Sequence, residues 1–167
     1  MQIINQTDPL LHRPSQQLAQ EQLSNTDEIK TLASLLIDCI YKKTAFGVSA
    51  CQLGIDVAMF AMEVNGRMRV CINPQIVASA VDMEIQEEGC LSYPGLSLKI
   101  RRPDSVVVRY LTIEGQEITE QLDGLDARVW LHEYDHTMGI CFTDRVSKLS
   151  LDMAKKKLNK QLKRNKR

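Results

Sequence analysis

The sequence predicts an α+β fold in which antiparallel strands pack around a central helix. Three observations support this: apolar residues repeat at helical spacing over residues 27–43, β-rich segments separated by turn dipeptides follow over 57–122, and a second helical pattern begins after residue 124. Helices flank the strands and do not alternate with them, which favours segregated α and β elements. A chain of 167 residues suits a single domain with one core.

The first helix is predicted from about Asp27 to Lys43. Asn25 followed by Glu28 resembles a capping arrangement at its start. The segment before it, which contains Asp8-Pro9 and Arg13-Pro14, is expected to be irregular. The apolar residues that recur at helical spacing are Ile29, Leu32, Ala33, Leu36, Ile37 and Ile40.

A β-hairpin is predicted next, because Asn65-Gly66 is a strong signal for a two-residue turn. The flanking strands would be Val57–Val64 and Arg67–Ile72. We expect Asn73-Pro74 to end the second strand.

A second pair of strands and a second helix complete the prediction. Ser105–Ile113 is rich in β-branched residues, and a turn at Glu114-Gly115 leads into Gln116–Leu122. A helical run follows Asp123-Gly124, and Gly139 stands where a helix would stop. This last helix carries the chemically most informative residues.

Charge is balanced overall but unevenly distributed. The chain has 21 basic and 21 acidic residues, and eight of the basic ones lie in Lys155–Arg167, which has no acid. The other 13 basic residues stand against all 21 acidic ones, so a body of net charge −8 precedes a basic tail. We divide the chain into one domain, residues 1–150, and a basic C-terminal helical tail, residues 151–167.

Neither a membrane span nor a secretory signal is recognisable, so we expect a cytoplasmic protein. The five cysteines are odd in number and irregularly spaced, which argues against a disulfide framework. Most are expected to be small buried residues, and at least one is a candidate metal ligand.

The pentapeptide His132-Glu133-Tyr134-Asp135-His136 is an HExxH motif. On a helix, residues four apart share a face, so His132 and His136 can bind one metal ion. The Glu133 carboxylate can reach a water on that ion without being a ligand. Catalytic sites of this kind usually hold three protein ligands and one open position, so a third ligand must come from elsewhere.

The third ligand is sought among the remaining polar residues. No Glu follows Glu133, and Phe142 occupies the position of the last His in the longer metallopeptidase motif. His12, Asp144 and Asp152 remain candidates without a supporting motif. Cys90 has one, in Glu88-Gly89-Cys90-Leu91-Ser92, and its thiolate with two imidazoles would leave one position vacant.

These residues together resemble the three motifs of the peptide deformylases. They are Gly47-Val48-Ser49-Ala50-Cys51-Gln52, then Glu88-Gly89-Cys90-Leu91-Ser92, then the HExDH pentapeptide, within a resemblance that runs from about Asp8 to Val146. The resemblance implies a peptide deformylase-like fold. It also implies removal of the N-formyl group from the initiator methionine of new polypeptides.

The resemblance implies one divalent metal ion per chain, held by Cys90, His132 and His136. Ferrous iron is the expected ion in vivo, with zinc, nickel or cobalt as alternatives. Glu133 would take a proton from the attacking water and return it to the leaving amine. The Gln52 side-chain amide and the Leu91 backbone N–H would stabilise the charge on the formyl oxygen.

The substrate pocket is also inferred from the resemblance. The residues expected to line it or bind substrate are Phe46, Gly47, Glu88, Gly89, Leu91, Val129 and His132. Four positions depart from the common family pattern: Ala45, Ser49, Leu131 and Ser97. These departures concern the substrate contacts and the rate, and they leave the metal ligands intact.

Simpler interpretations exist for several of these residues. Gln52 could be a solvent-facing loop residue, and Glu88 an exposed charge. Phe46 and Val129 could be ordinary core residues, and the stem of Arg128 could simply cover apolar surface. Cys51 is expected to be packing only.

The tail has two interpretations. Leu151, Ala154, Leu158 and Leu162 share one helical face, and lysines surround them. The tail is either a solvated helix that frays or a contact to ribosomal RNA through Lys155–Arg167. N-formylmethionyl nascent chains are the expected partners, with no membrane contact and a monomer favoured.

Two other functions compete with deformylation. A metal-dependent amidase acting on another substrate would fit the four departures. A non-catalytic metal-binding protein would not need a carboxylate such as Glu133 beside its metal. Formylated, acetylated and unblocked methionyl peptides would distinguish these functions.

Overall fold

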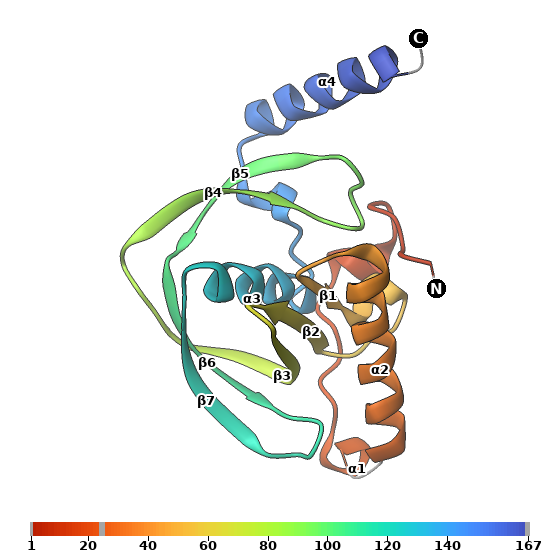
Figure 1. The fold of residues 1–167 in the computed structure, drawn as a ribbon, viewed down its shortest axis with the longest axis vertical. Coiled ribbons are helices and arrows are strands. Elements are labelled where there is room, and N and C mark those ends of the chain that lie inside the picture. The colour runs from red at the N-terminus through yellow and green to blue at the C-terminus, as the bar shows by residue number, and fades with distance from the viewer. Residues whose placement is uncertain (1, 24–25, 166–167) are drawn as a thin grey trace.

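A computed structural model describes residues 2–23 and 26–165, in which two antiparallel sheets enclose one helix (Figure 1). The predicted α+β class is confirmed. The first sheet has the strand order β1-β2-β3-β6-β7, and β4 and β5 form the second. The strands are β1 (Gly47–Ser49), β2 (Met59–Val64), β3 (Arg67–Ser79), β4 (Met83–Gly89), β5 (Ser97–Pro103), β6 (Ser105–Leu111) and β7 (Glu117–Asp123). The helices are α1 (Gln20–Leu23), α2 (Thr26–Lys43), α3 (Gly124–Thr137) and α4 (Lys148–Asn165), with short 3₁₀ turns η1 (Pro9–His12), η2 (Ala50–Leu53) and η3 (Phe142–Arg145).

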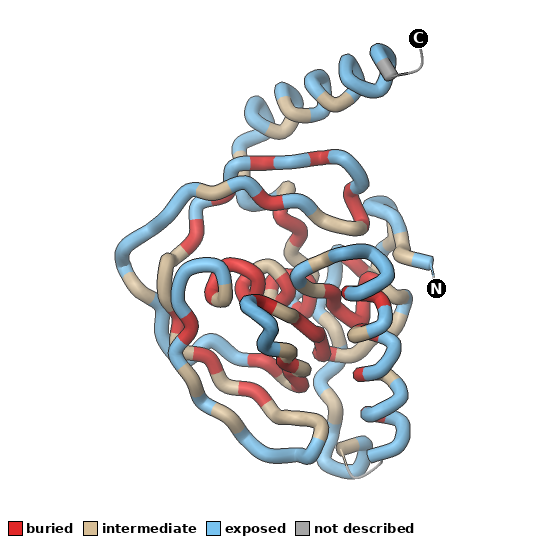
Figure 2. Tube along the Cα trace, viewed as in Figure 1, coloured by how far each residue is buried: buried red, intermediate tan, exposed pale blue. Residues whose placement is uncertain are grey.

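Helix α3 lies at the centre of the molecule and is buried on nearly all sides (Figure 2). Trp130 is fully buried and packs edge-on against Phe60 of β2. It also stacks on Tyr134, with 5.1 Å between the two ring centroids. The helix ends as predicted, because Gly139 adopts a φ of 71° that favours glycine. This packing fixes the direction in which the α3 side chains point.

Helix α2 covers one end of the five-stranded sheet with the apolar stripe read from the sequence. Ile29, Ala33, Leu36 and Ile40 are buried together with Val48 of β1. The helix begins one residue before the predicted Asp27. The cap predicted at Asn25 lies outside the described residues.

The predicted end of the second strand is wrong. Strand β3 continues past Asn73-Pro74 to Ser79, although proline has no N–H to donate. The pairing with β6 shifts register between Ile72 and Gln75, and Asn73 has a φ of 50°. Pro74 therefore stands in a bulge, where the ladder needs no N–H from it.

Three strands were not predicted: β1, β4 and β5. Strand β1 has only three residues, too few for a visible alternation. In the β4–β5 hairpin, Gly89 pairs with Ser97, so the loop between them starts at residue 90. The segment expected to be irregular contains η1 and α1.

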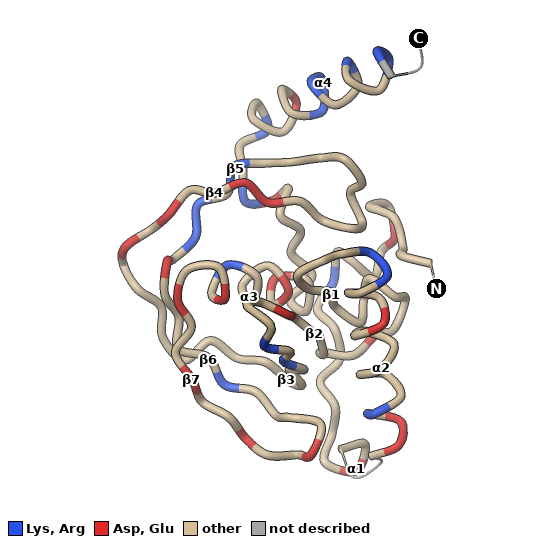
Figure 3. The backbone as a smooth tube through the Cα atoms, viewed as in Figure 1, with Lys and Arg blue, Asp and Glu red and all other residues tan. Residues whose placement is uncertain are grey.

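Helix α4 projects from the body and carries the basic residues of the tail (Figures 1 and 3). Leu151, Ala154 and Leu158 pack against the core cluster around Phe142, so one face of the helix is docked. Leu162 is half exposed. In the described part of the chain, no helix has the length and hydropathy needed to cross a membrane.

Candidate active site

The three predicted metal ligands come together in space. The ligand atoms of Cys90, His132 and His136 all lie within 4.8 Å of one another. His136 Nε2 lies 3.3 Å from Cys90 Sγ. Helix α3 supplies both histidines, one turn apart, and Cys90 is the first residue after β4. The cluster is thus formed where the end of the β4–β5 hairpin meets the central helix.

The donors fit a divalent metal ion. His132 Nδ1 lies 2.9 Å from Glu88 Oε2, which leaves its Nε2 available to a metal, as is usual for metal-binding histidines. Burial holds the pKa of His136 well below its usual value. His136 is therefore neutral, the form that binds metals. One thiolate and two imidazoles suit zinc, iron, cobalt or nickel.

Glu133 is buried beside the cluster and lines a cavity that opens there. Its Oε2 accepts a 2.7 Å hydrogen bond from the Ser49 hydroxyl. Burial raises the pKa of Glu133, and the hydrogen bond from Ser49 opposes that rise. The carboxylate is placed to exchange protons with a group in the cavity.

Gln52 is buried, so the interpretation of a solvent-facing loop residue is wrong. It lies on η2, where its Oε1 accepts from the Ser49 backbone N–H at 2.9 Å. Its amide nitrogen consequently faces the cluster, 3.3 Å from Cys90 Sγ and 3.4 Å from Ser92 Oγ. An N–H donor thus stands beside the ligand set.

A cavity of about 480 Å³ opens beside the cluster. Phe46 is 59% exposed at its wall, so the interpretation of this residue as core is wrong. Val129 is buried and belongs both to the core and to the cavity wall. Each residue predicted to line the pocket or bind substrate does line it: Phe46, Gly47, Glu88, Gly89, Leu91, Val129 and His132. Lys43, Pro94, Gly95 and Leu125 also line it and were not predicted.

Comparison with known proteins agrees with this geometry. The family model described as polypeptide deformylase matches residues 1–152. The chain belongs to the polypeptide deformylase family. It is a metal-dependent hydrolase that removes the N-formyl group from the N-terminal formyl-methionine of newly synthesised polypeptides.

Other deformylases resemble this one along most of the chain. The peptide deformylase of Thermotoga neapolitana is 34% identical over 152 residues, which are 90% of each protein. The structure of a peptide deformylase from Synechococcus elongatus in complex with actinonin has a TM-score of 0.87 and 32% identity, over 95% of this chain and 86% of that one. The Met-Ala-Ser-bound peptide deformylase of Acinetobacter baumannii has a TM-score of 0.82 and 26% identity, over 87% and 98%.

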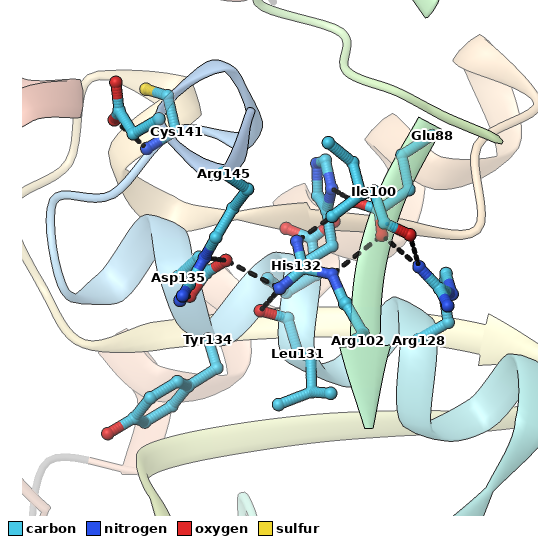
Figure 4. A network of polar contacts seen from close by, with 12 residues as sticks. Glu88, Ile100, Arg102, Arg128, Leu131, His132, Tyr134, Asp135, Cys141 and Arg145 are labelled. Atoms are coloured by element: carbon cyan, nitrogen blue, oxygen red, sulfur yellow. Dashed lines mark hydrogen bonds and ion pairs between the residues drawn. The ribbon is translucent and has the colours of Figure 1, made fainter. Parts of the chain in front are cut away.

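Behind the cluster of this deformylase lies a buried network of charges (Figure 4). Glu88 accepts from Arg102 at 2.7 and 3.0 Å and from Arg128 at 2.9 Å. Burial alone would raise the pKa of Glu88, but the hydrogen bonds from His132 and Arg102 lower it below its ordinary value. Glu88 is therefore an ionised acceptor that orients His132, and it is not the exposed charge considered above.

Arg102 joins the two ends of this network. Its Nη1 donates a hydrogen bond to Asp135 Oδ2 at 2.7 Å. Asp135 also accepts hydrogen bonds from the guanidinium of Arg145, which lies on η3. Figure 4 shows Arg102 between Glu88 and Asp135. No motif in the sequence assigned a role to Arg102. The structure shows that Asp135 is buried, and a buried carboxylate needs a cation nearby. The available signal in the sequence was the position of Asp135 inside the pentapeptide.

Proposed function

We propose that Cys90, His132 and His136 hold the one divalent metal ion of this deformylase, with Fe²⁺ as the ion in vivo. The observation that supports this most strongly is the distance between their ligand atoms, all within 4.8 Å. Glu88 fixes the orientation of the His132 ring, which further supports this ligand set. Zn²⁺, Ni²⁺ and Co²⁺ suit the same donors and are expected to bind in vitro.

The chain's own residues divide the remaining work. When bound, a divalent ion would polarise the formyl group and activate water. Glu133 takes a proton from the attacking water and returns it to the leaving amine, because its carboxylate lines the cavity beside the ligands. The Gln52 amide and the Leu91 backbone N–H stabilise charge on the formyl oxygen. The position of the Gln52 amide nitrogen, 3.3 Å from Cys90 Sγ, supports this role.

The cavity receives the methionine end of the substrate. Phe46 and Val129 offer apolar surface for its side chain. The backbone at Gly47 belongs to β1, which is an edge strand of the five-stranded sheet, so an extended peptide can pair beside it. The Met-Ala-Ser bound to the Acinetobacter baumannii relative supports this occupant. A narrow site would select formyl by size, since its carbonyl carbon carries only hydrogen.

The ligand set is tested by metal content. Cys90→Ala is expected to lose at least about tenfold in metal affinity and to lose formate release from formyl-Met-Ala-Ser, because one of three ligands is gone. Protein purified anaerobically is reconstituted with Fe²⁺, Ni²⁺ or Zn²⁺, and bound metal per chain and formate are both measured. Cys39→Ala, which removes a buried thiol on α2, is the control. A Cys90→Ala protein with unchanged metal affinity would contradict the assignment.

We also propose that residues 151–167 form a tail with a role separate from the catalytic domain, residues 1–150. The tail is proposed to contact ribosomal RNA near the place where the nascent chain, the substrate of the catalytic domain, emerges. The basic side chains support this, since Lys156, Lys160 and Lys163 are exposed on α4 while Leu158 is docked. A cytoplasmic monomer is the form we propose, because one chain supplies every member of the cluster.

Removing charge from the tail should weaken binding to ribosomes without changing turnover on a short peptide. Deletion of the tail would also remove Leu158, which lies beside Gly95 of the cavity wall. Substitution is therefore the cleaner change. Lys156, Lys160 and Lys163 are replaced together by Gln, and co-sedimentation with ribosomes is measured over a range of salt. The slope of the logarithm of the binding constant against the logarithm of salt concentration should become less steep by about one for each phosphate contact that is lost. Replacing Lys30, Arg67 and Arg101 by Gln removes three exposed charges elsewhere and should have no effect; equal binding by both triple variants would exclude the proposal.

A further inference from the structure

Ser49 is one of the four positions at which this chain departs from the common family pattern, and it is fully buried. Its hydroxyl oxygen lies 2.7 Å from Glu133 Oε2 and 3.0 Å from the Glu133 backbone oxygen. A hydroxyl has one proton to donate, and the shorter contact is the one to the carboxylate. Such charge-assisted bonds are about twice as strong as neutral ones. Ser49 therefore holds one oxygen of Glu133.

The other carboxylate oxygen is placed by Gly47. Residues 47 and 49 of β1 point to the same side of the strand, and Val48 points into the core. A Cβ at Gly47 would lie 2.7 Å from Glu133 Oε1 and 2.8 Å from Cγ, too close for any real contact. The absence of that carbon leaves the space that the Glu133 side chain occupies.

The two oxygens of Glu133 are therefore unequal. Oε2 is engaged by Ser49, whereas Oε1 has no hydrogen-bond partner among the residues that the structure describes. Glu133 and Gly47 both line the cavity. The free oxygen is the one able to exchange a proton with a group bound there.

The backbone of Ser49 also contacts Gln52, the second polar side chain of the site. Its N–H donates to Gln52 Oε1 at 2.9 Å, which turns the Gln52 amide nitrogen toward Cys90. One residue thus orients two side chains, one through the main chain and one through the hydroxyl. A substitution at position 49 leaves the main-chain contact in place, so the role of the hydroxyl can be tested alone.

We propose that Ser49 is a positioning residue for deformylation, whose hydroxyl holds Oε2 of Glu133 so that Oε1 alone is presented to the reacting groups. This inference rests on the proposed acid/base role of Glu133. Holding a catalytic group in a single orientation speeds the chemical step and leaves binding of the substrate unchanged. The effect should therefore appear in kcat and not in KM.

Ser49→Ala is expected to lower kcat for formyl-Met-Ala-Ser about tenfold, as loss of a hydrogen bond to a charged group implies. KM should stay within about twofold, and bound metal per chain should equal that of the parent. Ser49→Thr keeps the hydroxyl and should recover most of the rate. A serine with a purely structural role would change the unfolding midpoint in Ser49→Ala and leave kcat as it was, which would overturn the proposal.

A double-mutant cycle with Glu133→Gln separates this inference from the proposed function. Ser49→Ala should cost little further rate in the Glu133→Gln background, because the oxygen that it orients no longer takes a proton. An equal tenfold loss in both backgrounds would mean that Ser49 acts on another group, and the proposal would fail. Near-normal turnover by Glu133→Gln alone would instead remove the acid/base role itself.

Gly47→Ala disturbs the same carboxylate from its other side. The added Cβ must displace Oε1, so kcat is expected to fall by about a hundredfold. Gly47 does not have a positive φ, so alanine should be compatible with the fold. A Gly47→Ala enzyme with the parent kcat would show that the orientation of Glu133 does not limit the rate, and the proposal would fail.

Discussion

Replacing Glu133 with Gln is expected to reduce kcat on formyl-Met-Ala-Ser by about 10²–10⁴-fold, the range for loss of a general acid/base. Gln has nearly the same shape as Glu, so it should fill the space beside Gly47 and keep a contact with the Ser49 hydroxyl. It cannot accept the proton that the attacking water must lose. The barrier to the chemical step therefore rises while the site stays assembled.

Metal content and formate release, measured on the same protein samples, decide this prediction. Glu133 is not among the clustered ligand atoms, so Glu133→Gln should bind as much metal per chain as the parent. Glu28→Gln, an exposed carboxylate on α2, serves as the matched control and should be fully active. If the Glu133→Gln enzyme released formate at a rate near that of the parent, another group would have to carry the proton.

Arg102→Met is expected to lower the free energy of unfolding by about 3–5 kcal/mol, the usual cost of breaking a buried ion pair. The side chains of Arg102, Glu88 and Asp135 are only 3–5% exposed. Removing the guanidinium leaves two buried carboxylates with fewer donors, which costs free energy because a buried charge needs its partners. Methionine fills much of the volume, so the loss reflects charge and hydrogen bonds more than packing.

Urea unfolding of the purified protein measures this change directly. Arg101→Met is the control, because its side chain is exposed on the same strand and should shift stability by less than about 0.5 kcal/mol. Arg102→Lys should recover only part of the loss, since an ammonium cannot reproduce the fork that meets Glu88 at two oxygens. Similar midpoints for Arg101→Met and Arg102→Met would show that the network contributes little to the fold.

The parts of the structure that could be read from the sequence are those with local signals. Helices α2 and α3 and the turn at Asn65-Gly66 follow from periodicity and turn chemistry, which depend on neighbours in the chain. Cys90, His132 and His136 were predicted through motifs, and the structure brings them together.

The parts that could not be predicted depend on contacts between distant residues. Strand β3 continues through Pro74 because a bulge removes the need for its N–H, and that bulge is visible only in the pairing with β6. Arg102 reaches Asp135 across 33 positions, and Ser49 reaches Glu133 across 84. A polar residue in a sequence gives no indication of which buried partner it will meet.

Strand β1 has β2 on one side and, within the described residues, no strand on the other. A nascent chain paired with that open edge is held by main-chain groups, which are nearly the same whatever amino acids follow the methionine. Such an enzyme places few demands on the coding sequence downstream of a start codon. If substrates pair in this way, many different proteins can share one processing enzyme, and their first residues can drift in evolution without escaping it. Proline would be the exception, because it brings no N–H to the edge.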